Sequence, residues 1–139
     1  MSNLDSHRRS ADMFNSRDWD GFAADLAENC ELVDRARNVT VKGRQQALEQ
    51  NQAWVTAFSD GRITSPRFID AGSTTVMLFT GTGRNDGPLG PLPATGRESS
   101  APFCEIREYD RDGKVVRTEW YYDQLTIMTQ LGHMQPPAG

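Results

Sequence analysis

The chain has 139 residues, of which 37% are hydrophobic and 24% charged, and its formal net charge is −4. This length favours one domain over residues 1–139, with enough chain to bury a core. The acidic balance argues against a nucleic-acid-binding protein, which needs clustered Lys and Arg side chains, and no apolar run approaches the roughly 18 residues of a membrane span.

The N-terminal segment and the rarer residue types point to a cytoplasmic protein without a metal. The segment MSNLDSHRRSADMF lacks the apolar centre of a signal peptide. Cys30 and Cys104 fit no metal or redox spacing and are expected to be reduced thiols. The two histidines, His7 and His133, lie near the two ends of the chain, so a histidine metal site is not expected.

The first 60 residues are predicted to be mainly helical. A helix is expected from about residue 6 to 15, with Phe14 turned inward, and a second follows where apolar residues recur at i, i+3, i+4 and i+7, namely Trp19, Phe22, Ala23 and Leu26. Residues 31–34 and 38–42 are short strand candidates. A third helix is predicted from Gly43 to about Ser59, with an inward stripe of Ala47, Asn51, Trp54, Val55 and Phe58.

The hydrophobic period then changes from helical to alternating. Residues 62–70, 73–83, 97–109 and 114–123 are rich in Thr, Val, Ile and aromatic residues, and they predict strands joined partly by hairpin turns. A short helix is expected over 124–131, ended by Gly132. Helices followed by antiparallel strands predict an α+β fold, in which a bent sheet wraps the helices as a cone with a small-molecule pocket at its mouth.

Three motifs in about the last 60 residues occur in a recognisable order. They are Pro-x-Thr-Gly-Arg at 93–97, Asp-Gly-Lys-Val at 112–115, and Asp123 followed eight residues later by Leu131-Gly132. Together they resemble the SnoaL-like polyketide cyclase family of the nuclear-transport-factor-2-like superfamily, which also holds ketosteroid isomerase and limonene epoxide hydrolase. The resemblance implies a cone-shaped, cystatin-like α+β barrel with a curved antiparallel sheet, commonly dimeric and enclosing a hydrophobic cavity.

The resemblance also implies a cofactor-independent enzyme that acts on a small hydrophobic or aromatic substrate. In the family's cyclases an aspartate on the last strand is the general base for an intramolecular aldol cyclisation, and Asp123 is the matching position. Those cyclases carry a histidine on the preceding strand, whereas residues 97–109 have none, and Cys104 and Glu105 lie nearest to its place. Glu105 is therefore a candidate second catalytic carboxylate, although an exposed strand position is its default.

Other activities stay open as alternatives. An isomerase, a dehydratase (a lyase) or a hydrolase would use the same base, and the fold also hosts non-catalytic small-molecule-binding or dimerisation modules. If the chain is a non-catalytic module, Asp123 is expected to be exposed or held by helix amides, and the cavity is expected to be small. If it is an enzyme, an enclosed pocket that Asp123 enters is expected.

Asp123 has two interpretations. As the N-cap of the helix over 124–131 it would accept hydrogen bonds from helix amides. As a base it would lie in an apolar pocket, where desolvation raises a carboxyl pKa. In that case strand alternation turns Glu119 and Tyr121 into the cavity as substrate-binding residues, and Trp120 and Tyr122 outward as the centre of a sheet-to-sheet homodimer.

The helices supply the other predicted pocket residues. Asn51 is a polar residue in an apolar stripe, so its amide is expected to bond either a backbone group or a substrate oxygen. The aromatic residues Phe14, Trp19, Trp54 and Phe58 are core residues by default and cavity-wall residues in the alternative. The loop over 84–96 is expected to be either a rim or lid over the pocket or a solvated connector.

Overall fold

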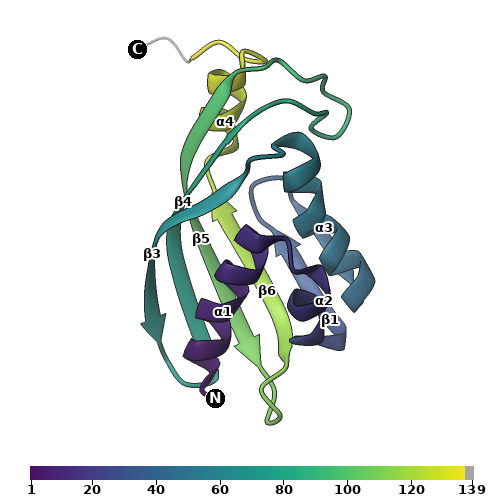
Figure 1. Cartoon of the computed structure of the whole chain (residues 1–139), viewed down its shortest axis with the longest axis vertical. Coiled ribbons are helices and arrows are strands. Elements are labelled where there is room, and N and C mark those ends of the chain that lie inside the picture. The colour runs from purple at the N-terminus through teal and green to yellow at the C-terminus, as the bar shows by residue number, and fades with distance from the viewer. Residues whose placement is uncertain (137–139) are drawn as a thin grey trace.

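The computed structural model describes residues 1–136 of the chain. Figure 1 shows α1, α2 and α3 packed against one face of a curled sheet, with α4 at its upper end. The α+β fold expected from the sequence is confirmed. The elements in chain order are α1 (Asn3–Ser16), α2 (Trp19–Ala24), β1 (Leu26–Asp34), β2 (Val39–Lys42), α3 (Arg44–Ala57), β3 (Arg62–Asp70), β4 (Thr74–Arg84), β5 (Glu98–Tyr109), β6 (Val115–Tyr122) and α4 (Gln124–Leu131).

The six strands form one sheet in the order β2-β1-β6-β5-β4-β3. Strands β3 to β6 pair antiparallel in sequence order, as the hairpin signals predict. Strand β1 pairs with β6 in parallel, with Leu32 opposite Thr118. The sheet curls around the helices without closing, so one concave face is covered by the N-terminal half of the chain (Figure 1).

The boundaries of the first elements follow from local hydrogen bonds. A capping box starts α1, because the Asp5 amide donates to Ser2 Oγ (3.0 Å) and the Ser2 amide donates to Asp5 Oδ2 (3.3 Å). Leu26, which the sequence places on the second helix, instead begins β1. The Val115 amide donates to the Asp25 carbonyl (2.9 Å), and this bond draws the chain into the sheet directly after α2.

The apolar interior has two parts, and Trp54 of α3 contacts both. The first cluster lies under α1, α2 and α3 and includes Phe14, Phe22, Leu32 and Trp120. The second lies under α4 and includes Ala57, Phe58, Ala101, Ile127, Met128 and Leu131. None of the helices in the described part of the chain is long and apolar enough to cross a membrane.

The facing of β6 is the reverse of the predicted one. Trp120 is only 6% exposed and Tyr122 packs against both core clusters, whereas Tyr121 is 45% exposed on the opposite face. The prediction assumed that the strand's alternation extends to Asp123. The strand ends at Tyr122 and Asp123 belongs to the start of α4, so the two large aromatic side chains are free to fill the concave face.

Candidate functional site

A mainly apolar pocket lies between the helices and the concave face of the sheet. Its volume is about 80 Å³. Arg62 is the exposed residue of its lining, so the pocket reaches solvent where β3 begins. The lining residues are Ser10, Phe14, Phe22, Asn51, Trp54, Phe58, Gly61, Arg62, Ile63, Met77, Phe79, Gly81, Thr82, Gly83, Ser99, Phe103, Glu105, Trp120 and Ile127.

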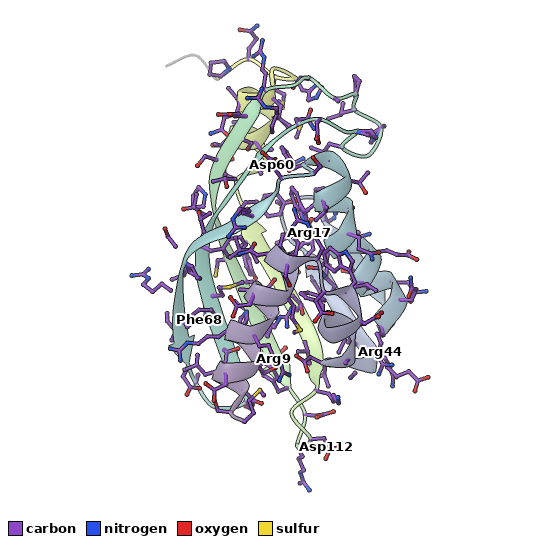
Figure 2. All side chains as sticks on the ribbon, in the orientation of Figure 1. Arg9, Arg17, Arg44, Asp60, Phe68 and Asp112 are labelled. Carbon is purple, nitrogen blue, oxygen red and sulfur yellow. The ribbon has the colours of Figure 1, made fainter. Side chains whose placement is uncertain are left out.

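A turn between α3 and β3 forms the edge of this opening. Arg17, just after α1, donates to the carbonyl of Gly61 (2.7 Å) and to that of Ser59 (2.9 Å). Figure 2 shows Arg17 and Asp60 close to the upper end of α1, where these contacts lie. The guanidinium therefore joins the end of α1 to this turn.

Glu105 is the one carboxylate that lines the pocket in the described part of the chain, and it is 6% exposed. Its Oε1 atom lies 2.9 Å from His7 Nε2 on α1, and its Oε2 atom accepts a hydrogen bond from Trp120 Nε1 (2.8 Å). Arg107 Nε lies 3.1 Å from Oε1, but it is not aligned for a hydrogen bond, so that contact is purely electrostatic. A buried carboxylate normally needs such partners.

These contacts determine the charges in the site. Burial alone would raise the pKa of Glu105, but the Arg107 guanidinium and the hydrogen bonds from His7 and Trp120 outweigh it and lower the pKa to about 2. Burial lowers the pKa of His7, and the hydrogen bond to Glu105 opposes that effect only in part. The site at neutral pH therefore holds an ionised Glu105, a cationic Arg107 and a neutral His7.

The structure brings five of the predicted site residues to the pocket wall. They are Glu105, Asn51, Trp54, Phe58 and Phe14. The Asn51 amide donates from Nδ2 to the Ala47 carbonyl (2.9 Å), which is the backbone partner that one interpretation expects. Trp19 lies behind the wall, where it packs edge-on against Phe14 with ring centroids 5.7 Å apart.

Asp123 is exposed and does not line the pocket. Its Oδ1 atom accepts from the Thr126 amide (3.1 Å) and its Oδ2 atom from the Thr126 hydroxyl (2.6 Å). Both hydrogen bonds lower the pKa of the carboxyl group. The expected position inside the cavity is therefore wrong, and the N-cap interpretation describes the residue.

Glu119 and Tyr121 lie outside the pocket because the facing of β6 is the reverse of the predicted one, which places both side chains on the outer face of the sheet. Glu119 pairs with Arg35 (3.0 Å) on the outer face of the sheet, and the Tyr121 hydroxyl donates to Glu119 Oε2 (3.1 Å). These residues form part of a surface ion network with no contact to the cavity. The prediction that both residues line the cavity is therefore wrong, because it depended on Asp123 pointing into the cavity.

His7 is one of the site residues that the sequence analysis missed, together with Arg107 and the lining residues Phe79 and Phe103, and its position near the end of the chain suggested nothing about its surroundings. The signal was its spacing. His7, Ser10 and Phe14 follow i, i+3 and i+7 and therefore share one face of α1, and all three are buried. A histidine on the same face as an inward aromatic residue predicts a place in the interior.

The loop over 84–96 does not cover the pocket, since none of its residues lines it. Buried Asn85 donates to the carbonyls of Ala57 (3.1 Å) and Gly87 (2.9 Å), which ties the loop to the end of α3. Leu89 and Leu92 pack against the core cluster under α4. The loop is therefore a structural cover of the second core cluster.

No group of three or more His, Cys, Asp or Glu side chains among residues 1–136 is arranged to hold a metal ion.

Comparisons with known proteins agree on the fold. A family model described as SnoaL-like polyketide cyclase matches residues 5–131. A protein from Jannaschia sp. CCS1 assigned as a SnoaL-like polyketide cyclase is 22% identical, with a TM-score of 0.86 over 97% of this chain and 93% of its own. One from Pseudomonas putida KT2440 assigned as a polyketide cyclase is 20% identical, with a TM-score of 0.84 over 95% and 99%.

A third similar structure carries a ligand. It is a protein from Catenulispora acidiphila DSM 44928 with a ketosteroid isomerase-like fold, in complex with trimethylamine. It is 17% identical, with a TM-score of 0.72 over 91% of this chain and 93% of its own. At these identities the likeness shows the fold alone. No curated protein matches the sequence.

Proposed function

This chain belongs to the SnoaL-like polyketide cyclase family, and from that premise we propose that it is a cofactor-independent enzyme that removes a proton next to a carbonyl group, with Glu105 as the base. The observation that carries the proposal is one buried, ionised carboxylate in the wall of an otherwise mainly apolar pocket. The enolate formed would then close a ring by aldol addition, or would be reprotonated elsewhere in an isomerisation.

The low pKa of Glu105 restricts the substrate. With a pKa of about 2 the carboxylate is always in its reactive form at neutral pH, but it is a weak base. A weak base suits a carbon whose proton is already acidic, such as one between two carbonyl groups. Filling the pocket with an apolar substrate excludes water and strengthens the base.

The pocket wall suits a small ring or a short chain. Trp54, Phe103 and Phe58 offer aromatic surfaces, and Trp54 and Phe103 meet edge to face with centroids 5.6 Å apart. A volume of about 80 Å³ is smaller than a benzene-sized cavity of roughly 150 Å³, so a larger substrate extends through the opening at Arg62. On the helical side, Asn51 of α3 keeps one Nδ2 proton free for the substrate's oxygen beside its bond to Ala47, whereas the Ser10 hydroxyl already donates to the His7 carbonyl.

The test is deuterium uptake by a small β-keto ester in D2O, followed by proton NMR with and without the protein. We expect the protein to accelerate uptake, and Glu105→Gln to lower that acceleration about 100-fold, the scale of one positioned base. Asp123→Asn is the matched control and should keep full acceleration. Isomerisation and dehydration start with the same proton removal, so the probe covers them as well.

Glu105→Gln alone leaves Arg107 as an unpaired buried charge, which commonly costs about 3–5 kcal/mol of folding free energy. The double variant Glu105→Gln/Arg107→Met removes both charges and is expected to fold, as a thermal melt would verify. If the folded double variant still accelerates deuterium uptake fully, Glu105 is not the base.

Binding without catalysis is the second candidate function, and two observations favour it. Asp123 is held by a helix amide, as a non-catalytic module predicts, and Glu105 is a permanent anion beside aromatic rings. A carboxylate with aromatic faces suits a small ammonium ion, and the similar protein from Catenulispora is in complex with trimethylamine. Titration calorimetry with trimethylamine tests this function. Binding that Glu105→Gln/Arg107→Met abolishes, together with no deuterium uptake in the wild type, would favour it.

A further inference from the structure

A single file of buried polar side chains leads from Glu105 away from the pocket. His7 Nε2 lies 2.9 Å from Glu105 Oε1, His7 Nδ1 lies 2.7 Å from Thr75 Oγ1, and Thr75 Oγ1 lies 3.0 Å from the Tyr109 hydroxyl. His7 and Thr75 are 0% exposed, and Tyr109 is 7% exposed. Three elements contribute the file: α1, β4 and β5.

The charges of the site fix the direction of each hydrogen bond. The ionised Glu105 can only accept, so the proton of the neutral imidazole sits on Nε2. His7 Nδ1 then accepts from the Thr75 hydroxyl, and the Thr75 oxygen accepts from the Tyr109 hydroxyl. Each member between the ends donates one hydrogen bond and accepts one, which is the arrangement that proton transfer along a chain requires.

At the base of the molecule, on the Tyr109 side of the file, lies a second, polar pocket, which Tyr109 itself does not line. This pocket has a volume of about 220 Å³, and its lining includes Ser6, Arg9, Asp25, Asp112 and Lys114. Figure 2 shows Asp112 at the lower tip of the molecule and Arg9 on the lower half of α1. Val115, which is paired with Tyr109 across the sheet, donates its amide to the Asp25 carbonyl.

Two oxygens of this polar pocket are buried without a partner among the described residues. They are Ser6 Oγ and Asp25 Oδ2. Buried oxygens of this kind are normally bonded to ordered water. The polar pocket therefore offers the chemistry needed to accept or supply a proton near Tyr109.

We propose that Tyr109, Thr75 and His7 form a relay that carries protons between Glu105 and the polar pocket at the base. In the inward step the His7 Nε2 proton passes to Glu105, the Thr75 proton to His7 Nδ1, the Tyr109 proton to Thr75, and a solvent proton replaces that of Tyr109. Only Glu105 gains a proton, and every hydrogen bond in the file reverses. The outward step starts from this reversed file, in which protonated Glu105 donates to His7 Nε2, and runs the same transfers backwards.

The relay deepens the proposed function, and it rests on that function only for the claim that Glu105 takes a proton from a substrate. It lets Glu105 exchange its proton with solvent while an apolar substrate or product still blocks the opening at Arg62, and removal of a proton taken from the substrate requires the reversed file, in which His7 Nε2 accepts. Tyr109, Thr75 and His7 are positioning and proton-carrying residues that need not touch the substrate, since none of the three lines its pocket.

The test uses the protein alone, with its two histidines labelled with ¹⁵N. NMR measures how fast the His7 Nε2 proton exchanges with solvent, and His133→Gln identifies the signal. We expect Tyr109→Phe and Thr75→Val to slow this exchange about 100-fold, because each removes one hydroxyl from the file and keeps the shape of the side chain. Thr74→Val, the neighbouring residue on the other face of β4, is the matched control and should leave the rate unchanged.

Whether the exchange of the His7 Nε2 proton becomes slower or faster distinguishes the relay from a purely structural role of these residues. A variant that only loosens the structure exchanges faster at His7, and its buried backbone amides in β4 and β5 exchange faster in parallel. Unchanged or faster exchange at His7 in both variants would overturn the relay. Because no substrate is present, this result is independent of the deuterium-uptake test, and either proposal can fail without the other.

Discussion

At the scale of single residues, the site depends on which carboxylate is inside. Sequence reasoning assigns Glu105 an exposed strand position by default, because a glutamate is rarely buried unless it is paired. Its partners Arg107 and Trp120 lie on β5 and β6, but His7 is 98 positions away along the chain. The residues that make a buried Glu105 tolerable are therefore visible only once the fold brings α1 onto the sheet.

The buried state of His7 has a measurable consequence in acid. Burial lowers its pKa below the ordinary 6.5, so the unfolded chain binds a proton more readily and stability should fall as the pH drops below about 6.5. Glu105, with a pKa lowered from 4.5 to about 2, adds stability that is present above about 4.5 and lost towards pH 2. The His7 effect therefore begins at a higher pH than the Glu105 effect.

The variant His7→Gln tests the effect of His7 on stability, which begins at the higher pH. A glutamine can still donate to Glu105 from its amide, but it does not ionise. Urea unfolding of the wild type should show a free energy of unfolding that already declines as the pH drops below about 6.5, and the variant should stay nearly flat until the Glu105 effect begins at about pH 4.5. His133→Gln should decline like the wild type, and a decline of equal size in His7→Gln would contradict the assignment.

At the scale of elements, the sequence predicts every helix and strand, and most boundaries to within a few residues. The β-rich half is the clearest case, since its alternation and turn residues are local signals. The facing of β6 is different, because alternation alone leaves two choices of face. The decisive fact was whether Asp123 belongs to the strand or to the following helix, and only the hydrogen bonds of Asp123 to Thr126 settle that.

The capping role of Asp123 predicts different results for two substitutions. Asp123→Ala removes both hydrogen bonds to Thr126 and should lower the melting temperature, because the first turn of α4 loses its cap. Asp123→Asn keeps an acceptor oxygen and should melt close to the wild type. Thermal unfolding followed by circular dichroism measures both, and equal losses in the two variants would mean that the charge matters more than the cap.

At the scale of the whole molecule, the observed facing of β6 changes which residues can form the interface of the predicted homodimer. Trp120 and Tyr122 are inside, so they cannot anchor it. The outer face of the sheet carries a double row of apolar side chains. Ile69, Val76 and Ile106 pair in one row, which ends at Glu119, and Leu78, Cys104 and Tyr121 pair in the next, which ends at Arg67. Ile69 is 51% exposed and Tyr121 45% exposed. We propose that this double row is the centre of a two-fold interface.

Light scattering tests the dimer without any substrate. The wild type should have twice the monomer mass of 15.5 kDa at low micromolar concentration. Leu78→Asp places a charge in the centre of the row and should raise the dissociation constant about 30-fold or more, the effect of losing an anchor of about 2 kcal/mol. Leu125→Asp, on α4 and away from the row, is the control and should stay dimeric. A wild type that is monomeric would remove the interface.

The parallel pairing of β1 with β6 also fixes when the protein can fold on the ribosome. The first strand of the chain lies in the sheet beside the last one, with β2 on its other side. Until β6 has left the exit tunnel, β1 and β2 have no sheet to join, and Glu105 lacks the hydrogen bond from Trp120 that completes its surroundings. Contacts between such distant parts of a chain form slowly. The nascent domain therefore exposes the apolar faces of α2 and α3 until β6 emerges, and the pocket is among the last of its features to be completed.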